Sequence, residues 1–261
     1  MYRLDSIITQ GAERFPENTA IAFYDHKITY RELAEGVETL AHTLRSLGIT
    51  HEHRVGILMP NCPQAVCAYF AGLSCGAVVV PANPLLKPAE LAYIWGDANI
   101  SVVLTVAPLA PGATIAQESL PNLKHVLVVD PAQPLSALTL ENLAPQVTPV
   151  IPTVAPVVRG DNDCAVIIYT SGTTGHPKGA MLSHKNLVRN VEQVQEFLQF
   201  QLSDSFLTVL PLFHSFAMTV CQNLVLSEGC TMVLMEQFSP VKAYQTMLEQ
   251  GVTIMPGVPA L

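Results

Sequence analysis

The sequence predicts an α/β fold made of layered parallel-sheet subdomains with flanking helices. Amphipathic helix patterns alternate with short apolar strands along most of the chain, an order that is typical of parallel sheets. At 261 residues the chain is long enough to bury a substantial core. Its 13 Lys and Arg against 21 Asp and Glu give a net charge of −8 without a dense basic cluster, which argues against nucleic acid as a partner.

The first elements follow from local patterns. Thr29 and Glu32 form a capping box, and apolar residues then recur at spacings of three and four up to Gly48, which predicts an amphipathic helix. The elements expected next are a strand over 54–58, a helix over 63–75, a strand over 77–80, a helix over 88–98 and a strand over 101–105.

The apolar stretch over 65–80 raises the question of a membrane span. Its 16 residues fall short of the roughly 20 that a transmembrane helix needs, so we predict a buried helix followed by a buried strand. Residues 1–17 lack the apolar centre of a signal peptide. The six cysteines are scattered in apolar surroundings, which indicates reduced core residues of a cytoplasmic protein.

Residues 108–160 differ in composition, because they hold nine of the 20 prolines around one strand-like run at 125–129. We interpret them as a surface excursion or connector. Regular alternation then resumes, with strands expected over 164–169, 206–210, 231–235 and 252–255, and helices expected after Ser183, over 215–226 and over 240–250.

A polar loop follows the strand at 164–169. Tyr169 to Gly179 reads YTSGTTGHPKG, with four Ser or Thr residues, three glycines and one lysine. Glycines let backbone N–H groups converge on an anion, and hydroxyls and a cation complete a phosphate site. The P-loop pattern GxxxxGK[ST] does not fit, because Pro177 takes the place of its second glycine and Gly179 follows Lys178.

Residues 169–179 resemble the phosphate-binding signature of the adenylate-forming superfamily, YTSG[ST]TGxPKG, and match every fixed position. The resemblance implies that Lys178 and Thr170 act in catalysis. It implies a phosphate site formed by Thr170, Ser171, Gly172, Thr173, Thr174, Gly175, Lys178 and Gly179. A loop lysine is usually a solvated charge, and this remains the alternative for Lys178. His176 fills the variable position and receives no role.

Residues 210–214, LPLFH, resemble a motif of acyl-CoA ligases within that superfamily. The resemblance places His214 beside the acyl-adenylate pocket, whose apolar wall would include Phe213, Phe216, Ala217 and Met218. A histidine in an apolar run is often a structural residue of the core, and this alternative stays open. Residues 28–33 and 73–83 also resemble superfamily segments, in the expected order.

The resemblance implies an AMP-forming medium- or long-chain fatty acid CoA ligase. In such enzymes a carboxylate attacks the α-phosphate of MgATP, pyrophosphate leaves, and the CoA thiol displaces AMP from the acyl-adenylate. ATP, Mg²⁺ and CoA are thus the implied cofactors. Later superfamily segments, among them YGxTE and a C-terminal lysine, are not found in these 261 residues. We therefore expect part of a large N-terminal domain, with no C-terminal domain and no activity alone.

Two alternatives remain. The chain could be a non-catalytic nucleotide- or acyl-binding fragment, or it could belong to a fatty acyl-AMP ligase or adenylation unit whose acceptor is not CoA. The sequence does not define the length of the acyl chain, or whether the acid is aromatic. It contains no basic amphipathic helix that would support peripheral membrane contact.

Overall fold

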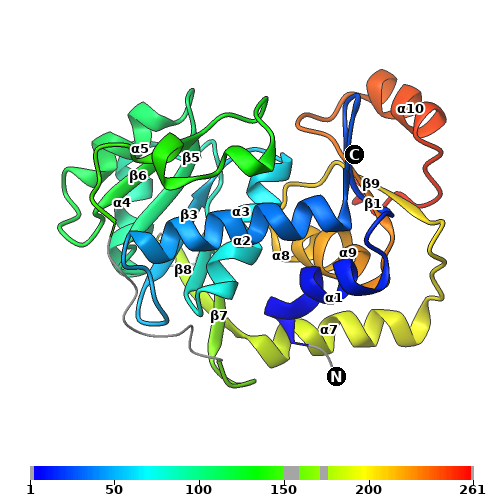
Figure 1. The fold of residues 1–261 in the computed structure, drawn as a ribbon, viewed down its shortest axis with the longest axis horizontal. Helices are drawn as coiled ribbons and strands as arrows, with labels where there is room; N and C mark the ends of the chain where they lie inside the picture. The colour runs from blue at the N-terminus through cyan, green and yellow to red at the C-terminus, as the bar shows by residue number, and fades with distance from the viewer. Residues whose placement is uncertain (1–2, 150–158, 171–175, 260–261) are drawn as a thin grey trace. The chain divides into compact units, whose positions relative to one another are not determined.

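The computed structural model describes residues 3–149, 159–170 and 176–259, and the chain divides into two compact units (Figure 1). Unit 1 comprises Met1–Glu35, Pro60–Val66 and Lys185–Leu261, and unit 2 comprises Gly36–Met59 and Cys67–His184. Each unit is built around one sheet that contains parallel strands. The predicted α/β class with layered parallel-sheet subdomains is confirmed.

Unit 2 contains a six-stranded sheet in the order β6-β5-β3-β4-β7-β8. Neighbouring strands pair in parallel, except that β7 and β8 form an antiparallel hairpin. The strands are β3 (Arg54–Leu58), β4 (Val78–Pro81), β5 (Val102–Val106), β6 (His125–Val129), β7 (Cys164–Thr170) and β8 (Lys178–Ser183). Strands β3, β4 and β5 are almost wholly buried, which is why each reads as a continuous apolar run.

Helices cover both faces of this sheet. On one face α4 (Pro88–Asp97) and α5 (Ala110–Gln117) pack together against apolar side chains that include Val78 and Val80. On the other lies α3 (Pro63–Ser74), because a Cβ on its Gly72 would lie 2.8 Å from Val79. Successive strand residues point to opposite faces, so Val79 contacts α3 while its neighbours contact α4 and α5.

The apolar stretch over 65–80 thus forms a buried helix and a buried strand, as predicted. Among the described residues, no helix combines the length and the apolar content needed to cross a bilayer.

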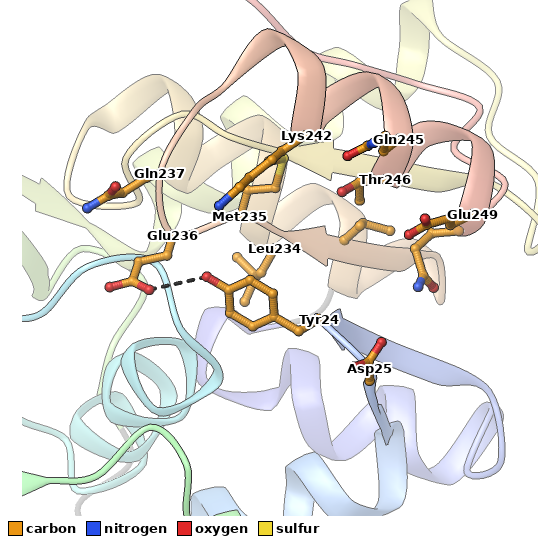
Figure 2. Close-up of a pocket in the computed structure, with 12 residues that line it drawn as sticks. Tyr24, Asp25, Leu234, Met235, Glu236, Gln237, Lys242, Gln245, Thr246 and Glu249 are labelled. Atoms are coloured by element: carbon orange, nitrogen blue, oxygen red, sulfur yellow. Dashed lines mark hydrogen bonds between the residues drawn. The ribbon is translucent and has the colours of Figure 1, made fainter.

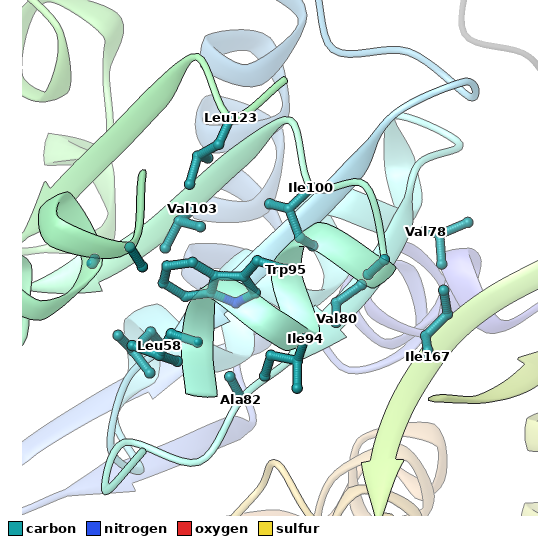
Figure 3. Packing of buried hydrophobic residues seen from close by; sticks show 14 residues of the cluster. Leu58, Val78, Val80, Ala82, Ile94, Trp95, Ile100, Val103, Leu123 and Ile167 are labelled. Atoms are coloured by element: carbon teal, nitrogen blue, oxygen red, sulfur yellow. The ribbon is translucent and has the colours of Figure 1, made fainter. Parts of the chain in front are cut away.

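Trp95 lies at the centre of the core of unit 2 (Figure 3). It has no exposed surface and packs in one cluster with Leu58, Ile94, Ile100 and Val103. Its indole Nε1 has no hydrogen-bond acceptor among the described residues, so the side chain contributes through apolar contact alone. These contacts anchor α4 to the sheet.

Unit 1 contains a four-stranded sheet in the order β2-β1-β10-β9. Strand β1 pairs in parallel with β10, β10 pairs in parallel with β9, and β1 forms an antiparallel hairpin with β2. The strands are β1 (Thr19–Phe23), β2 (His26–Thr29), β9 (Ser205–Thr208) and β10 (Thr231–Leu234). Longer helices of this part of the chain are α1 (Ile7–Arg14), α7 (His184–Phe197) and α10 (Pro240–Glu249).

Helix α2 (Tyr30–Ser46) confirms the predicted capping box. The Glu32 carboxylate accepts a hydrogen bond from the Thr29 backbone N–H at 2.8 Å, and the Thr29 hydroxyl accepts one from the Glu32 N–H at 3.2 Å. After the helix, Gly48 adopts a φ of +81°, the left-handed conformation that commonly follows a helix C-terminus.

The stretch 108–160, interpreted from the sequence as a surface excursion or connector, includes regular structure in its described residues. Strand β6 is a full member of the sheet, pairing with β5 over its five residues. The stretch also forms α5, a short 3₁₀ helix (Leu135–Ala137) and α6 (Leu140–Leu143). Pro111 and Pro134 stand at helix starts, where proline is well tolerated, so a high proline content is compatible with these helices. Residues 150–158 lie outside the described part.

Four further differences concern unit 1. Helix α1 and the β1–β2 hairpin were not predicted, and the strand expected over 252–255 is an isolated bridge between Ile254 and Phe206. The helix expected over 215–226 is divided into α8 (Ser215–Ala217), a π-helix (Met218–Asn223) and α9 (Leu224–Glu228). A short apolar pattern cannot distinguish a wider π-turn from an α-turn, so the sequence does not reveal this division.

Candidate functional site

The β7–β8 hairpin of unit 2 carries the signature residues that the structure describes. Thr170 ends β7, Lys178 begins β8, and the two are directly paired across the hairpin. Both residues are exposed. Gly179 pairs with Tyr169 one step further along the ladder. The remaining predicted phosphate-binding residues lie outside the described part of the chain: Ser171, Gly172, Thr173, Thr174 and Gly175.

The Lys178 side chain is exposed at the start of β8. Among the described residues, no carboxylate forms an ion pair with it. The hydroxyl of Thr170 stands on the opposite strand of the same pair. A cation and a hydroxyl donor at one place are suited to the oxygens of a phosphate group.

Gly179 has a packing reason to be glycine. A Cβ at this position would lie 2.8 Å from Ile167 Cγ2 and 3.0 Å from Tyr169 Cζ. These separations are shorter than ordinary carbon contacts, so the tyrosine ring and the isoleucine occupy the space that a side chain would need. The predicted role of Gly179 in phosphate binding stays a prediction, and the structure adds this steric role.

Tyr169 is tied to helix α4. Its hydroxyl donates a hydrogen bond of 2.5 Å to the Asp97 Oδ2 atom. Burial, followed by this hydrogen bond and the Asp97 charge, raises the pKa of Tyr169 well above its ordinary value, so the phenol remains a donor at neutral pH. Sequence patterns did not identify Asp97, because it lies 72 positions before its partner.

The LPLFH segment lies in unit 1, at the end of β9. The rings of Phe213 and His214 are in contact, with centroids 4.2 Å apart. Partial burial lowers the pKa of His214 below its ordinary value, which keeps the imidazole neutral at pH 7. Phe216 is 48% exposed, whereas Ala217 and Met218 have no exposed surface. The predicted acyl wall is therefore open at Phe216 and part of the core at the other two positions.

Asn61 fixes the backbone of this segment. It is buried, its Nδ2 donates to the Leu210 carbonyl at 3.0 Å, and its Oδ1 accepts from the Leu212 N–H at 3.0 Å. Sequence reasoning missed this residue. Its only local signal is a polar side chain between Pro60 and Pro63, which reads as part of a turn.

The π-helix follows directly after α8 and holds three buried polar side chains, Thr219, Gln222 and Asn223. The Thr208 hydroxyl of β9 donates to the Cys221 carbonyl within the same turn at 3.5 Å. Single π-turns are rare and often occur at functional sites. This one lies at the carboxyl end of β9, beside the LPLFH residues in the sequence.

A separate groove of about 400 Å³ lies at the carboxyl ends of β1 and β10, against α10. Figure 2 shows Tyr24 crossing it, with the phenol directed at Glu236, and the two are hydrogen-bonded at 3.3 Å. Tyr24 has a φ of +52° in the tight turn between β1 and β2. The lining includes three carboxylates, Asp25, Glu236 and Glu249, against one amine, Lys242. This negative balance disfavours a polyphosphate.

Comparison with known proteins connects this geometry to a family. Residues 8–261 match the family of AMP-binding enzymes. The chain belongs to this family. The predicted membership of the adenylate-forming superfamily is thereby confirmed. The structure resembles the inhibitor-bound N-terminal domain of FACL13 from Mycobacterium tuberculosis, with a TM-score of 0.87 and 29% identity, over 100% of this chain and 64% of that one.

Two curated relatives illustrate the range of acids within the AMP-binding family. A long-chain-fatty-acid–CoA ligase of Bacillus subtilis (strain 168) is 31% identical over 283 residues, covering 99% of this chain and 50% of the relative. A feruloyl-CoA synthase of Amycolatopsis sp is 33% identical over 265 residues, covering 99% and 49%. The chain thus spans about half the length of the curated relatives that it matches.

Proposed function

We propose that this chain is the N-terminal portion of an AMP-forming acid–thiol ligase. It would take part in the activation of a carboxylic acid with MgATP and in the transfer of the acyl group to CoA. The observation that carries the proposal is the pairing of Thr170 with Lys178 at the loop end of the β7–β8 hairpin, inside a signature that is matched at every fixed position.

In the proposed first step a carboxylate oxygen bonds to the α-phosphorus of ATP, and the bond to the bridging oxygen of the β-phosphate breaks. Negative charge collects on the departing pyrophosphate. Lys178 would bind this charge as a cation and Thr170 would donate its hydroxyl to a phosphate oxygen, so that both stabilise the leaving group. The described residues hold no group of three His, Cys, Asp or Glu side chains suited to a metal. Mg²⁺ would reach the site as part of the MgATP substrate.

The acid is proposed to be a medium- or long-chain fatty acid. Support comes from the fatty-acid ligase relative and from the neutral His214 beside the partly exposed rings of Phe213 and Phe216. Because another relative is a feruloyl-CoA synthase, an aromatic acid is the competing substrate. Trapping the acyl-adenylate as a hydroxamate with a panel of fatty and aromatic acids, with and without CoA, would separate these substrates and reveal a different acceptor.

The burial of Cys62, Cys67, Cys75, Cys221 and Cys230 among apolar side chains supports a reducing compartment, and we propose a cytoplasmic location.

Calorimetric titration of the purified chain with MgATP and with pyrophosphate tests the phosphate site. Because Lys178 is exposed, its attraction to an anion is partly screened, and we expect a loss of about 1.5 kcal/mol in Lys178→Ala, or about tenfold in Kd. Lys185→Ala is the matched control, since Lys185 is also exposed and lies seven positions later. Equal affinity in Lys178→Ala and Lys185→Ala would remove the assignment.

A further inference from the structure

Helix α4 contacts the β7–β8 hairpin through two side chains on adjacent turns. Tyr93 and Asp97 are four residues apart, so they lie on one side of the helix. The Asp97 carboxylate accepts the 2.5 Å hydrogen bond from Tyr169. The Tyr93 ring stacks on the His176 ring, with centroids 5.1 Å apart and planes inclined by 25°. All four residues belong to unit 2.

One of these contacts is made by a residue of β7, and the other by a residue just before β8. Tyr169 directly precedes Thr170 on β7, and His176 stands two positions before Lys178 on β8. Thus Thr170 and Lys178, at the loop end of the hairpin, each have a near neighbour in the sequence that contacts α4. The helix itself is anchored by Leu91, Ile94 and Trp95, which are buried in the core.

Helix stability does not account for Asp97. It is the last residue of α4, and a carboxylate at a helix C-terminus is opposed by the helix dipole. Nor does core packing account for Tyr93, whose side chain is 41% exposed. Asp97 forms a hydrogen bond with Tyr169, and Tyr93 stacks on His176.

We propose that Asp97 and Tyr93 are positioning residues that hold Thr170 and Lys178 in the arrangement that binds phosphate. This inference rests on the proposed function and deepens it. The Tyr169 phenol passes over Gly179 on its way to α4, so the tyrosine and the glycine of the signature act together with a residue outside it.

The test measures two quantities, the Kd for pyrophosphate and the Tm, in the full 261-residue chain. We expect Asp97→Asn and Tyr169→Phe each to weaken pyrophosphate binding by about threefold to tenfold, and the double variant to be no weaker than either single one. The Tm of Asp97→Asn should stay the same or rise, because the unfavourable charge at the helix end is removed. A residue with a purely structural role would lower the Tm and leave the Kd unchanged.

The stacking contact has its own pair of variants. Tyr93→Phe keeps the ring and should retain wild-type affinity, whereas Tyr93→Ala should weaken pyrophosphate binding to a similar extent as Asp97→Asn. Tyr244→Ala is the matched control, since it removes an exposed helical tyrosine of unit 1 and should leave the Kd unchanged.

Two outcomes distinguish the inference from the proposed function. If the wild-type chain binds pyrophosphate about tenfold more tightly than Lys178→Ala, but the variants at 93, 97 and 169 bind as the wild type does, the positioning role is wrong and the phosphate site stands. If the wild-type chain and Lys178→Ala bind pyrophosphate equally or not at all, the proposed function itself is contradicted.

Discussion

Replacing Gly179 with alanine tests how the signature is packed. The added Cβ would lie 2.8 Å from Ile167 Cγ2, 3.0 Å from Tyr169 Cζ and 3.2 Å from its Oη. Overpacking of this kind typically costs about 1–3 kcal/mol. Alanine is favoured over glycine in a strand by about 0.5–1 kcal/mol, so the free energy of unfolding should fall by about 0.5–2 kcal/mol in Gly179→Ala.

Urea and thermal denaturation of the purified chain measure this change. For a chain of this size, the expected loss corresponds to a fall in Tm of about 1–8 °C. Gly112→Ala is the matched control with the opposite sign. Gly112 lies in α5, where the nearest atom to an added Cβ is Pro88 Cγ at 3.9 Å, so helix propensity should raise stability by about 0.5–1 kcal/mol. A Tm of Gly179→Ala that stays the same or rises would refute the steric account of Gly179.

Three further predictions concern other described residues. Asn61→Ala should lower the free energy of unfolding by about 2–3 kcal/mol, because a buried carbonyl at Leu210 and a partly buried N–H at Leu212 lose their partners; an unchanged urea midpoint would contradict this role of Asn61. Trp95→Ala should lower the free energy of unfolding by about 3–5 kcal/mol, and Trp95→Phe by distinctly less, since the lost indole N–H has no acceptor among the described residues. Denaturation followed by circular dichroism measures both losses, and equal losses would contradict this prediction. Burial raises the pKa of Cys62 and Cys75 from 9.0 to about 12. The thiols therefore ionise at lower pH in the unfolded chain, and the free energy of unfolding should fall as the pH rises from about 9 to 12. If Cys62→Ala leaves the slope of this free energy against pH unaltered, ionisation of Cys62 is excluded as a cause.

Local patterns revealed much of the fold because several of its determinants are local. The capping box of Thr29 and Glu32 placed the start of α2, and Gly48 marked its end. The strands over 54–58 and 125–129 were predicted with the bounds that the structure shows, because each apolar run stands between residues that break a strand. The ordered signature over 169–179 likewise predicts a phosphate site from local residues alone, and this site stays a prediction.

What the sequence did not reveal depends on distant contacts or unusual backbone. Asn61 binds a backbone carbonyl 149 positions away, and Asp97 binds a hydroxyl 72 positions away; no local pattern pairs such residues. The β1–β2 hairpin was missed because Tyr24, and not glycine or asparagine, takes the positive φ in its turn. Prolines at helix starts made the region around α5 read as irregular.

Hydrogen–deuterium exchange with saturating MgATP tests the central claim most directly, because it locates the nucleotide on the chain. We expect slower exchange at the backbone amides of Thr170, Lys178 and Gly179, and a smaller effect in Lys178→Ala at the same nucleotide concentration. Protection confined to the groove around Glu236 and α10, with the hairpin amides unchanged, would contradict the phosphate site proposed for the hairpin.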